Sequence, residues 1–262
     1  MKVLIFKTAE EVKVQAARQL LMSVQRNPES VLGLATGGTM EDVYAELVKQ
    51  SHQHDASWAQ VTTFNLDEYW GISSDSPASY RTYMNHHLFD HIDVDPGATH
   101  IPPSEGDNPE MAAAQYEARI SGAGGIDLQL LGIGVNGHIG FNEPTSSLVS
   151  KTRLKTLTQS TRDANLRFFD TMEQVPRYAL TVGIGTIMAS DECLLVATGS
   201  SKAPAVQTMI EGPLAASCPA SALQMHQKVT VMLDEEAARD LELRSYYQLV
   251  HPDGQESAVS DG

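Results

Sequence analysis

Short apolar runs alternate with longer segments typical of helices along most of this chain, and this alternation constrains the fold more than any other feature. Segments typical of strands occur at 2–6, 31–35, 60–65, 126–131, 151–157, 178–184, 192–198 and 228–233. Helices are expected at 8–25, 41–49, 80–88, 110–120, 162–169 and 234–249. Because strands joined by helices usually pair in parallel, we predict an α/β fold: a mainly parallel central sheet with helices on both faces.

Residues 1–249 are expected to form one Rossmann-like domain. The sequence contains no internal repeat and no linker long enough to divide the core. Thr8 and Glu11 have the spacing of a capping box, and Pro109 has the position that favours a helix start. The last residues are polar, so we predict a disordered tail at 250–262.

Acidic residues outnumber basic ones by 33 to 18, and the formal net charge is −15. This excess disfavours attraction to nucleic acid or to an anionic membrane surface. The N-terminal apolar run is too short for a signal peptide, and no segment approaches the ~20 apolar residues of a membrane span. Cys193 and Cys218 have neither disulfide-framework nor zinc-site spacing. We therefore expect a cytoplasmic protein.

The segment from Leu131 to Pro144 combines four glycines with the imidazole of His138 and the carboxylate of Glu143. It follows a predicted strand, and open α/β sheets bind their ligands at the carboxyl ends of strands. His138 and Glu143 are therefore candidates for an acid/base pair. The three glycines before His138 also fit the dinucleotide-binding pattern, but Pro144 leaves no room for the long helix that this pattern requires. The alternative is a glycine-rich turn with a structural histidine.

Polar segments directly follow two more of the predicted strands. The turn Thr36-Gly37-Gly38-Thr39 precedes a helix and suits a phosphate, because glycines allow a tight turn and the helix start offers free N–H groups. Its alternative is a capped junction with Thr39 as the N-cap. Asp67 and Glu68 are adjacent carboxylates whose side chains point to opposite faces of a strand, so we expect one to act as a base and the other to hold structure. An ordinary acidic turn is the alternative.

Cations and histidines offer further candidates. Arg162, Arg167 and Lys202 lie near loop or strand ends and could pair with a dianionic phosphate, although each alone is typical of surface charge. Three histidines at 86–91 suggest a metal site, but no third ligand or supporting shell is visible, so we favour ordinary surface or partly buried histidines.

Four motifs, taken together and in order, resemble those of the glucosamine-6-phosphate deaminases. They are LGLATGGT at 32–39, TFNLDEY at 63–69, GIGVNGHIGFNEP at 132–144 and LTVGIGT at 180–186. The resemblance extends from near the N-terminus to about residue 235 and covers almost the whole predicted domain. It implies an enzyme of amino-sugar (N-acetylglucosamine) catabolism that converts glucosamine 6-phosphate and water to fructose 6-phosphate and ammonia, without a metal or organic cofactor.

The resemblance also implies roles for individual residues. Asp67 resembles the base that moves a proton from C2 to C1 through an enolamine. His138, held by Glu143 and Asn136, resembles the group that opens the sugar ring. The residues that resemble the phosphate site are Thr36, Gly37, Gly38, Thr39, Arg167 and Lys202. A carboxylate suits proton abstraction beside a carbonyl, and an imidazole titrates in the range that ring opening requires.

Two positions depart from the usual pattern of the family. Many relatives have Asp where this chain has Asn136, and an amide can orient an imidazole but cannot stabilise its cation by charge. Met40 stands where relatives usually have Pro, so the helix start lacks the fixed φ of proline. Neither departure breaks the assignment.

Some members of the family are hexamers activated by N-acetylglucosamine 6-phosphate at a subunit interface. The residues that resemble this effector site are Ser146, Arg153, Lys155 and Thr156. Arg153 and Lys155 are two apart on a predicted strand, so they share a face and could hold a second phosphate. Solvated surface charge is the alternative. The resemblance also implies a homo-oligomer and a lid at about 157–180 that closes over the sugar.

Two other functions are compatible with the implied fold. A hydrolase of 6-phosphogluconolactone would need no base at C2, and the Asp67 segment and the loop from His138 to Glu143 favour the deaminase. A sugar-phosphate-sensing domain of a transcription regulator should carry a basic helix-turn-helix at one end, whereas this chain begins with a predicted core strand and ends in a short acidic tail. We therefore predict deaminase activity.

Overall fold

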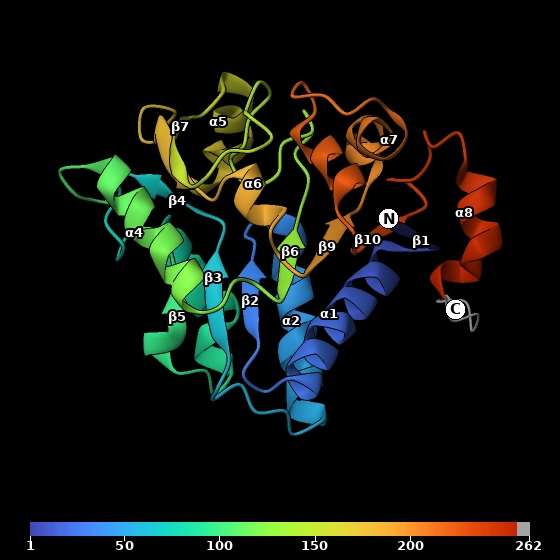
Figure 1. The fold of residues 1–262 in the computed structure, drawn as a ribbon, viewed down its shortest axis with the longest axis horizontal. Helices are drawn as coiled ribbons and strands as arrows, with labels where there is room; N and C mark the ends of the chain where they lie inside the picture. The colour runs from blue at the N-terminus through green and yellow to red at the C-terminus, as the bar shows by residue number, and fades with distance from the viewer. Residues whose placement is uncertain (256–262) are drawn as a thin grey trace.

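The computed structural model describes residues 1–255, apart from the side chain of Arg167. Its centre is a parallel sheet with the strand order β1-β10-β9-β6-β2-β3-β5 (Figure 1). These strands are β1 (Lys2–Phe6), β2 (Val31–Leu34), β3 (Thr62–Asn65), β5 (Thr99–His100), β6 (Leu128–Leu131), β9 (Glu192–Ala197) and β10 (Val229–Asp234). The predicted mainly parallel central sheet is confirmed.

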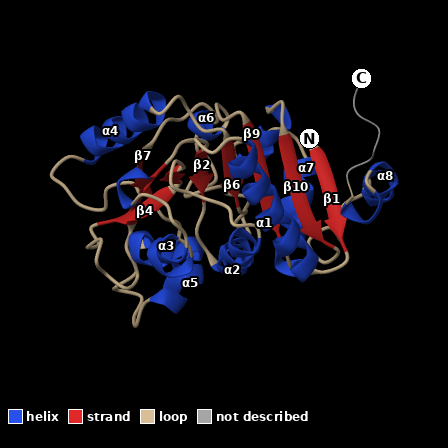
Figure 2. Ribbon diagram, turned by 90° about the horizontal axis from the view of Figure 1, so that it is seen from below, coloured by secondary structure: helices blue, strands red, loops and turns tan. Residues whose placement is uncertain are grey.

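Helices cover both faces of this sheet. They are α1 (Ala9–Arg26), α2 (Gly38–Gln53), α3 (Tyr80–His87), α4 (Pro109–Gly122), α5 (Gln159–Asn165), α6 (Ile184–Ile187), α7 (Ala203–Glu211) and α8 (Arg244–Val250). Short 3-10 helices are η1 (Phe89–His91), η2 (Pro96–Ala98), η3 (Leu166–Phe168), η4 (Ser200–Lys202), η5 (Pro219–Met225) and η6 (Pro252–Gly254). Figure 2 shows α2 and α3 on one face of the sheet and α4 and α6 on the other. None of the described helices combines the length and apolarity that crossing a membrane requires.

Local signals in the sequence begin two of these helices as predicted. The hydroxyl of Thr8 accepts the N–H of Glu11 at 3.2 Å, and the carboxylate of Glu11 reaches back to the N–H of Lys7 at 2.9 Å. Asn108 caps α4, and Pro109 is its first residue. In both cases a side-chain oxygen satisfies an N–H group that has no partner within the helix.

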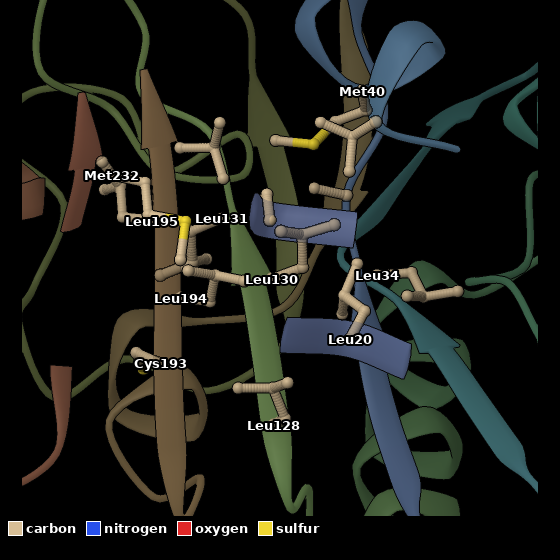
Figure 3. Packing of buried hydrophobic residues seen from close by; sticks show 14 of the residues in the cluster. Leu20, Leu34, Met40, Leu128, Leu130, Leu131, Cys193, Leu194, Leu195 and Met232 are labelled. Carbon is tan, nitrogen blue, oxygen red and sulfur yellow. The ribbon is translucent and has the colours of Figure 1, made fainter. Parts of the chain in front are cut away.

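Consecutive apolar residues of the central strands are buried on both sides of the sheet. Leu130 and Leu131 of β6 and Leu194 and Leu195 of β9 are fully buried, and Figure 3 shows them packed among side chains of β2, β10 and α1. Because neighbouring side chains on a strand point to opposite faces, an unbroken apolar run requires cover on both. β6 is therefore a rigid support for the glycine-rich loop that follows it.

A small antiparallel sheet accompanies the central one, with the order β4-β8-β7. Its strands are β4 (Asp67–Trp70), β7 (Arg153–Thr156) and β8 (Tyr178–Thr181). Strands lie in both segments predicted at 151–157 and 178–184, although α6 already begins at Ile184. β8 pairs with both β7 and β4, and neither β7 nor β8 joins the central sheet. Figure 1 shows β4 and β7 beyond the carboxyl ends of β2 and β3. The small sheet thus lies where ligands bind in α/β folds.

The helix predicted at 234–249 is wrong in its first part. β10 extends to Asp234, whose carboxylate accepts the backbone N–H groups of Gly199 and Ala237. Turns follow, and α8 begins only at Arg244. The bond to Gly199 spans 35 residues of sequence, so no local pattern could report it.

The predicted disordered tail at 250–262 stays a prediction, because residues 256–262 lie outside the described part of the chain. Within the described part, η6 follows α8, and Gly254 is buried beside the ring of Phe6 in β1.

We predict that Gly183→Ala destabilises the protein. The backbone of Ser150 and Lys151 passes directly beside Gly183, and a Cβ at Gly183 would overlap their carbonyl oxygens. Since this contact is with backbone, relief requires a shift of the main chain, and we expect a loss of about 1–3 kcal/mol in the free energy of unfolding. Urea denaturation measures it. Gly122→Ala is the control, because nothing lies within 4 Å of a Cβ there. Equal stability of the two variants would contradict the prediction.

Candidate active site

The candidate active site is a cavity of about 320 Å³ at the carboxyl ends of β2, β3 and β6. Residues from distant parts of the sequence, between Ala35 and Lys202, line it. Among the residues predicted from the sequence, those that line the cavity are Thr36, Gly37, Gly38, Thr39, Asp67, Asn136, His138 and Lys202. The structure therefore brings the three segments that end β2, β3 and β6 to one place, together with the loop after β9.

The imidazole of His138 is oriented by the side chain of Asn136. Nδ1 of His138 lies 2.7 Å from Oδ1 of Asn136, and the backbone N–H of His138 donates to the same oxygen at 3.2 Å. Because an amide oxygen can only accept, Nδ1 carries the hydrogen, and Nε2 of the neutral ring keeps its lone pair. Nε2 is therefore the atom of His138 that can take a proton. The amide at 136 is sufficient to set this tautomer.

Glu143 places a negative charge beside this imidazole. Its Oε2 accepts from Nδ2 of Asn136 at 2.9 Å and lies 3.6 Å from Nδ1 of His138. Burial raises the pKa of Glu143, but the neighbouring imidazole of His138 and hydrogen bonds from Thr161 and Asn136 outweigh it and lower the pKa to about 2. Glu143 is thus ionised at neutral pH and supplies the charge that an amide at 136 lacks.

The predicted lid is attached to Glu143. The backbone N–H and the hydroxyl of Thr158 donate to Oε1 of Glu143 at 3.2 and 3.1 Å, and the hydroxyl of Thr161 donates to the same oxygen. Ser160, Thr161, Ala164 and Asn165 of this segment line the cavity. The segment forms one wall of the site, and its closing movement stays a prediction. No sequence signal singled out Thr158 and Thr161, because their partner lies on another element.

Glycines of the loop after β6 make room for the polar side chains. A Cβ at Gly134 would overlap the ring of His138. Gly140 has a φ of +55°, and a Cβ there would lie 3.3 Å from Oδ2 of Asp67. Gly137 has a φ of +82°, a conformation that favours glycine. Turns follow this loop, not the helix of a dinucleotide site, so its glycines serve His138 and Asp67.

Asp67 is a buried carboxylate facing the cavity, with 6% of the residue exposed. Burial and the nearby charge of Glu68 raise its pKa to about 8, although the backbone N–H of Phe141 partly opposes this. Such a carboxylate binds a proton far more tightly than an ordinary aspartate. Asp67 therefore has the property required of a base that acts on a weak acid.

Glu68 has different surroundings, as its adjacent position on a strand predicts. It is 1% exposed, and its carboxylate accepts the N–H groups of Tyr69, Tyr80 and Arg81. Burial raises its pKa to about 7 against the effect of these bonds. It lines a second cavity of about 290 Å³, away from Asp67. Glu68 therefore holds local structure and does not face the first cavity.

The turn Thr36–Thr39 stands at the start of α2. Gly37 is the N-cap, with a φ of 106°, and no side chain caps the helix. The alternative with Thr39 as N-cap is therefore wrong, because the helix already begins at Gly38. Free N–H groups at this helix start and the positive end of its dipole favour an anion in the cavity.

Lys202 brings a positive charge to the same cavity. Its Nζ donates to the backbone carbonyl of Ile133 at 2.7 Å. Arg167 lies on η3, directly after α5 of the lid, and its side chain is outside what the structure describes. Arg162 instead donates to the carbonyls of Met172 and Val175 and so ties the lid segment together. Its candidacy for the phosphate is therefore not supported.

Tyr80 is a cavity residue that the sequence analysis missed. It lies in the first turn of α3, and its hydroxyl donates to that of Tyr69 at 3.3 Å. Burial raises its pKa well above the usual value, so the phenol stays protonated. Tyrosines in predicted helices are usually packed in cores, and only the position of α3 brings this one to the site.

The proposed effector residues lie outside this cavity. Arg153 and Lys155 are on β7, and Ser146 is buried. Nη1 of Arg153 donates to Oδ1 of Asn142 at 2.8 Å. Arg153 therefore contacts the residue directly before Glu143.

The histidines at 86–91 make contacts other than metal coordination. Nε2 of His91 lies 2.8 Å from the carbonyl oxygen of His86, and the rings of His86 and His87 meet edge to face. In the part of the chain that the structure describes, no group of three or more His, Cys, Asp or Glu side chains is arranged to hold a metal ion.

A family model described as glucosamine-6-phosphate isomerases/6-phosphogluconolactonase matches residues 6–232, which include every residue that lines the cavity. The chain belongs to this family. A glucosamine-6-phosphate deaminase of Marinomonas sp. is 53% identical over 251 residues, 95% of this chain and 94% of the relative. That of Shewanella woodyi is 48% identical over 255 residues, 97% of each chain.

Solved structures are similar as well. A monomeric glucosamine-6-phosphate deaminase has a TM-score of 0.90 and 47% identity, covering 92% of this chain and 100% of that one. The 6-phosphogluconolactonase from Trypanosoma brucei has a TM-score of 0.71 and 20% identity, covering 92% of this chain and 98% of that one. The second likeness shows the fold alone.

We predict that Lys202→Met weakens binding of inorganic phosphate by about tenfold or more, because a hydrogen bond to a charged group contributes about 1.5–3 kcal/mol. Isothermal titration calorimetry with phosphate measures it. Lys228→Met is the control, since Lys228 is exposed and lies beside Glu192, outside the cavity. Equal phosphate affinity in the two variants would contradict a role for Lys202 in the phosphate site.

Proposed function

We propose that this protein is a glucosamine-6-phosphate deaminase that converts glucosamine 6-phosphate and water to fructose 6-phosphate and ammonia in amino-sugar catabolism. The observation that carries the proposal is Asp67, a carboxylate buried in the cavity with a pKa raised to about 8. A raised pKa suits a base that removes a proton from carbon. The deaminases at 48% and 53% identity support the same reaction.

Phosphate binding fixes one end of the substrate in this proposal. The turn Thr36–Thr39 offers the N–H groups of a helix start, and Lys202 adds a positive charge. Arg167, on the lid, is proposed to pair with the same phosphate when the lid closes. With the C6 end held there, the C1 and C2 atoms lie toward Asp67 and His138, which line the same cavity.

His138 opens the sugar ring. Its Nε2 takes the proton of the C1 hydroxyl group and returns a proton to the ring oxygen, so the C1–O5 bond breaks and an open-chain aldehyde forms. Asn136 and Glu143 keep Nδ1 protonated and the ring in place during this exchange.

Asp67 then moves a proton from C2 to C1. Removing the C2 proton lets its bonding electrons form the C1=C2 bond of an enolamine. The C1 oxygen gains a proton from the ammonium group at C2, which becomes a neutral amine. Asp67 returns its proton to C1, and the nitrogen lone pair forms a C2=N iminium group. Water adds to C2 and ammonia leaves, which produces the ketone of fructose 6-phosphate.

Two alternative functions do not use this carboxylate. Hydrolysis of 6-phosphogluconolactone breaks an ester and requires no proton to leave carbon, and a sensor domain requires no base at all. A buried carboxylate that is not needed would be a cost to stability, since burial disfavours its charged form. Asp67 therefore favours the deaminase over both.

We predict that Asp67→Asn lowers kcat for deamination by about 10²–10⁴-fold, the range that a positioned acid/base group contributes. Asn has nearly the same shape but cannot take the C2 proton. A coupled assay of ammonia and fructose 6-phosphate measures turnover, and calorimetry with inorganic phosphate, expected to change by less than about twofold, checks the fold of the site.

Each other outcome of this assay has a distinct meaning. Undiminished turnover by Asp67→Asn would show that the base is another group. Absence of turnover in the wild type, with phosphosugar binding retained, would favour a sensor. Hydrolysis of 6-phosphogluconolactone without deamination would favour the lactonase.

We also propose that Ser146, Arg153, Lys155 and Thr156 bind the phosphate of an effector such as N-acetylglucosamine 6-phosphate. Nη2 of Arg153 and Oγ of Ser146 are buried without a hydrogen-bond partner among the described residues. Burial and the charge of Arg153 lower the pKa of Lys155. An anion would satisfy both cations, and the bond from Arg153 to Asn142 would connect it to the loop of His138.

We predict that N-acetylglucosamine 6-phosphate lowers the half-saturating concentration of substrate about fivefold or more in the wild type, within the usual range of coupling between sites. Arg153→Ala should abolish this effect, and Arg239→Ala, on the exposed surface, should retain it. Saturation curves with and without effector measure both. A wild-type curve that the effector leaves unchanged would remove the regulatory site.

The resemblance connects such regulation with a homo-oligomer, a hexamer in some members. The similar deaminase of solved structure is described as monomeric. The oligomeric state of this chain stays a prediction, as does its cytoplasmic location, and analytical ultracentrifugation with and without effector tests the former.

A further inference from the structure

The carboxylate of Glu68 holds the first turn of α3. Its Oε1 accepts the N–H groups of Tyr69 at 2.8 Å and Tyr80 at 3.0 Å, and its Oε2 accepts the N–H of Arg81 at 3.1 Å. Tyr80 and Arg81 begin α3, where backbone N–H groups have no partner within the helix. The residue directly after Asp67 therefore holds the start of α3 together with the N-cap Ser79, whose hydroxyl accepts the N–H of Thr82.

Two tyrosines of α3 contact the phosphate turn Thr36–Thr39. The hydroxyl of Tyr83 donates to the carbonyl oxygen of Gly37 at 2.9 Å. Tyr80 lines the same cavity as Thr36, and the side chain of Thr36 lies close enough to lower the pKa of its hydroxyl. Because Gly37 is the N-cap of α2, the bond from Tyr83 attaches α3 to the helix start that is suited to bind phosphate.

We propose that Glu68 is a positioning residue: by holding the start of α3 it fixes Tyr80 and Tyr83, and through them the phosphate turn, at a set distance from Asp67. This inference rests on the proposed function, since the substrate carries its phosphate at one end and its reacting carbon near the other. Both ends are productive only when turn and base are spaced to match.

A purely local role for Glu68 is the competing explanation. α3 has other anchors, because Ser79 caps its first turn and the guanidinium of Arg81 donates to Oγ1 and to the carbonyl oxygen of Thr99 in β5. If those anchors were sufficient, loss of the Glu68 carboxylate would change stability without changing the phosphate turn. The two explanations therefore differ in whether Glu68 and Tyr83 act on phosphate binding through one path.

The test is a double-mutant cycle of Glu68→Gln and Tyr83→Phe, with inorganic phosphate as the probe in calorimetry. A glutamine keeps one acceptor but turns an NH₂ group toward the N–H donors of α3. We expect Tyr83→Phe to weaken phosphate binding about fivefold, the effect of one hydrogen bond, and Glu68→Gln to weaken it at least as much. Since both act through α3, the double variant should be within about twofold of Glu68→Gln.

Kinetics supply a second readout. Tyr83→Phe should raise KM for glucosamine 6-phosphate about fivefold and change kcat by less than about twofold, because only the phosphate end of the site is altered. Glu105→Gln is the control and should match the wild type, since Glu105 is exposed and lines the same second cavity as Glu68.

Several results would overturn the proposal. One is a double variant whose loss of phosphate affinity equals the product of the two single losses. The others are wild-type phosphate affinity in Glu68→Gln and absence of phosphate binding by the wild type. If Glu68→Gln does not fold, unchanged phosphate affinity and unchanged KM in Tyr83→Phe would overturn it. Absence of deamination together with the expected phosphate results would instead contradict the proposed function and leave the positioning role supported.

Discussion

The site depends on keeping the carboxylate of Asp67 buried at the junction of two sheets. β3 ends at Asn65 and β4 begins at Asp67, so the chain passes from the parallel sheet to the antiparallel one within two residues. This abrupt passage turns Asp67 into the cavity and away from water. Gly140, with its positive φ and no side chain, lets the loop after β6 approach Asp67 closely. The phosphate turn follows β2, the strand beside β3. The remaining parts of the site are arranged around this carboxylate.

Three carboxylates near the cavity differ in chemistry because their surroundings differ. Burial and a neighbouring charge raise the pKa of Asp67 to about 8, while hydrogen bonds hold that of Glu143 at about 2. Glu68, with a pKa of about 7, is used to hold backbone N–H groups. The group with the raised pKa suits proton transfer at carbon, and Glu143, which is ionised at neutral pH, suits support of His138. Such separation of pKa values is how enzymes assign roles to similar residues.

Much of the fold could be predicted because uninterrupted apolar runs indicate buried strands. The different surroundings of Asp67 and Glu68 could be predicted because neighbouring side chains on a strand point to opposite faces. Contacts between elements could not be predicted. Thr161 contacts Glu143 because the fold places the lid segment beside the loop after β6. Tyr80 lines the cavity because of where α3 starts. β7 was expected to be extended, but none of its four residues is buried, so no pattern identifies their partners.

The most direct measurement uses glucosamine 6-phosphate deuterated at C2 and follows the deuterium into C1 of the product while the enzyme turns over in ordinary water. If Asp67 carries the proton from C2 to C1, NMR should show deuterium at one stereochemical position of C1 in fructose 6-phosphate, and Asp67→Asn should form almost no product. Product with no deuterium at C1, formed equally fast by Asp67→Asn, would contradict the account.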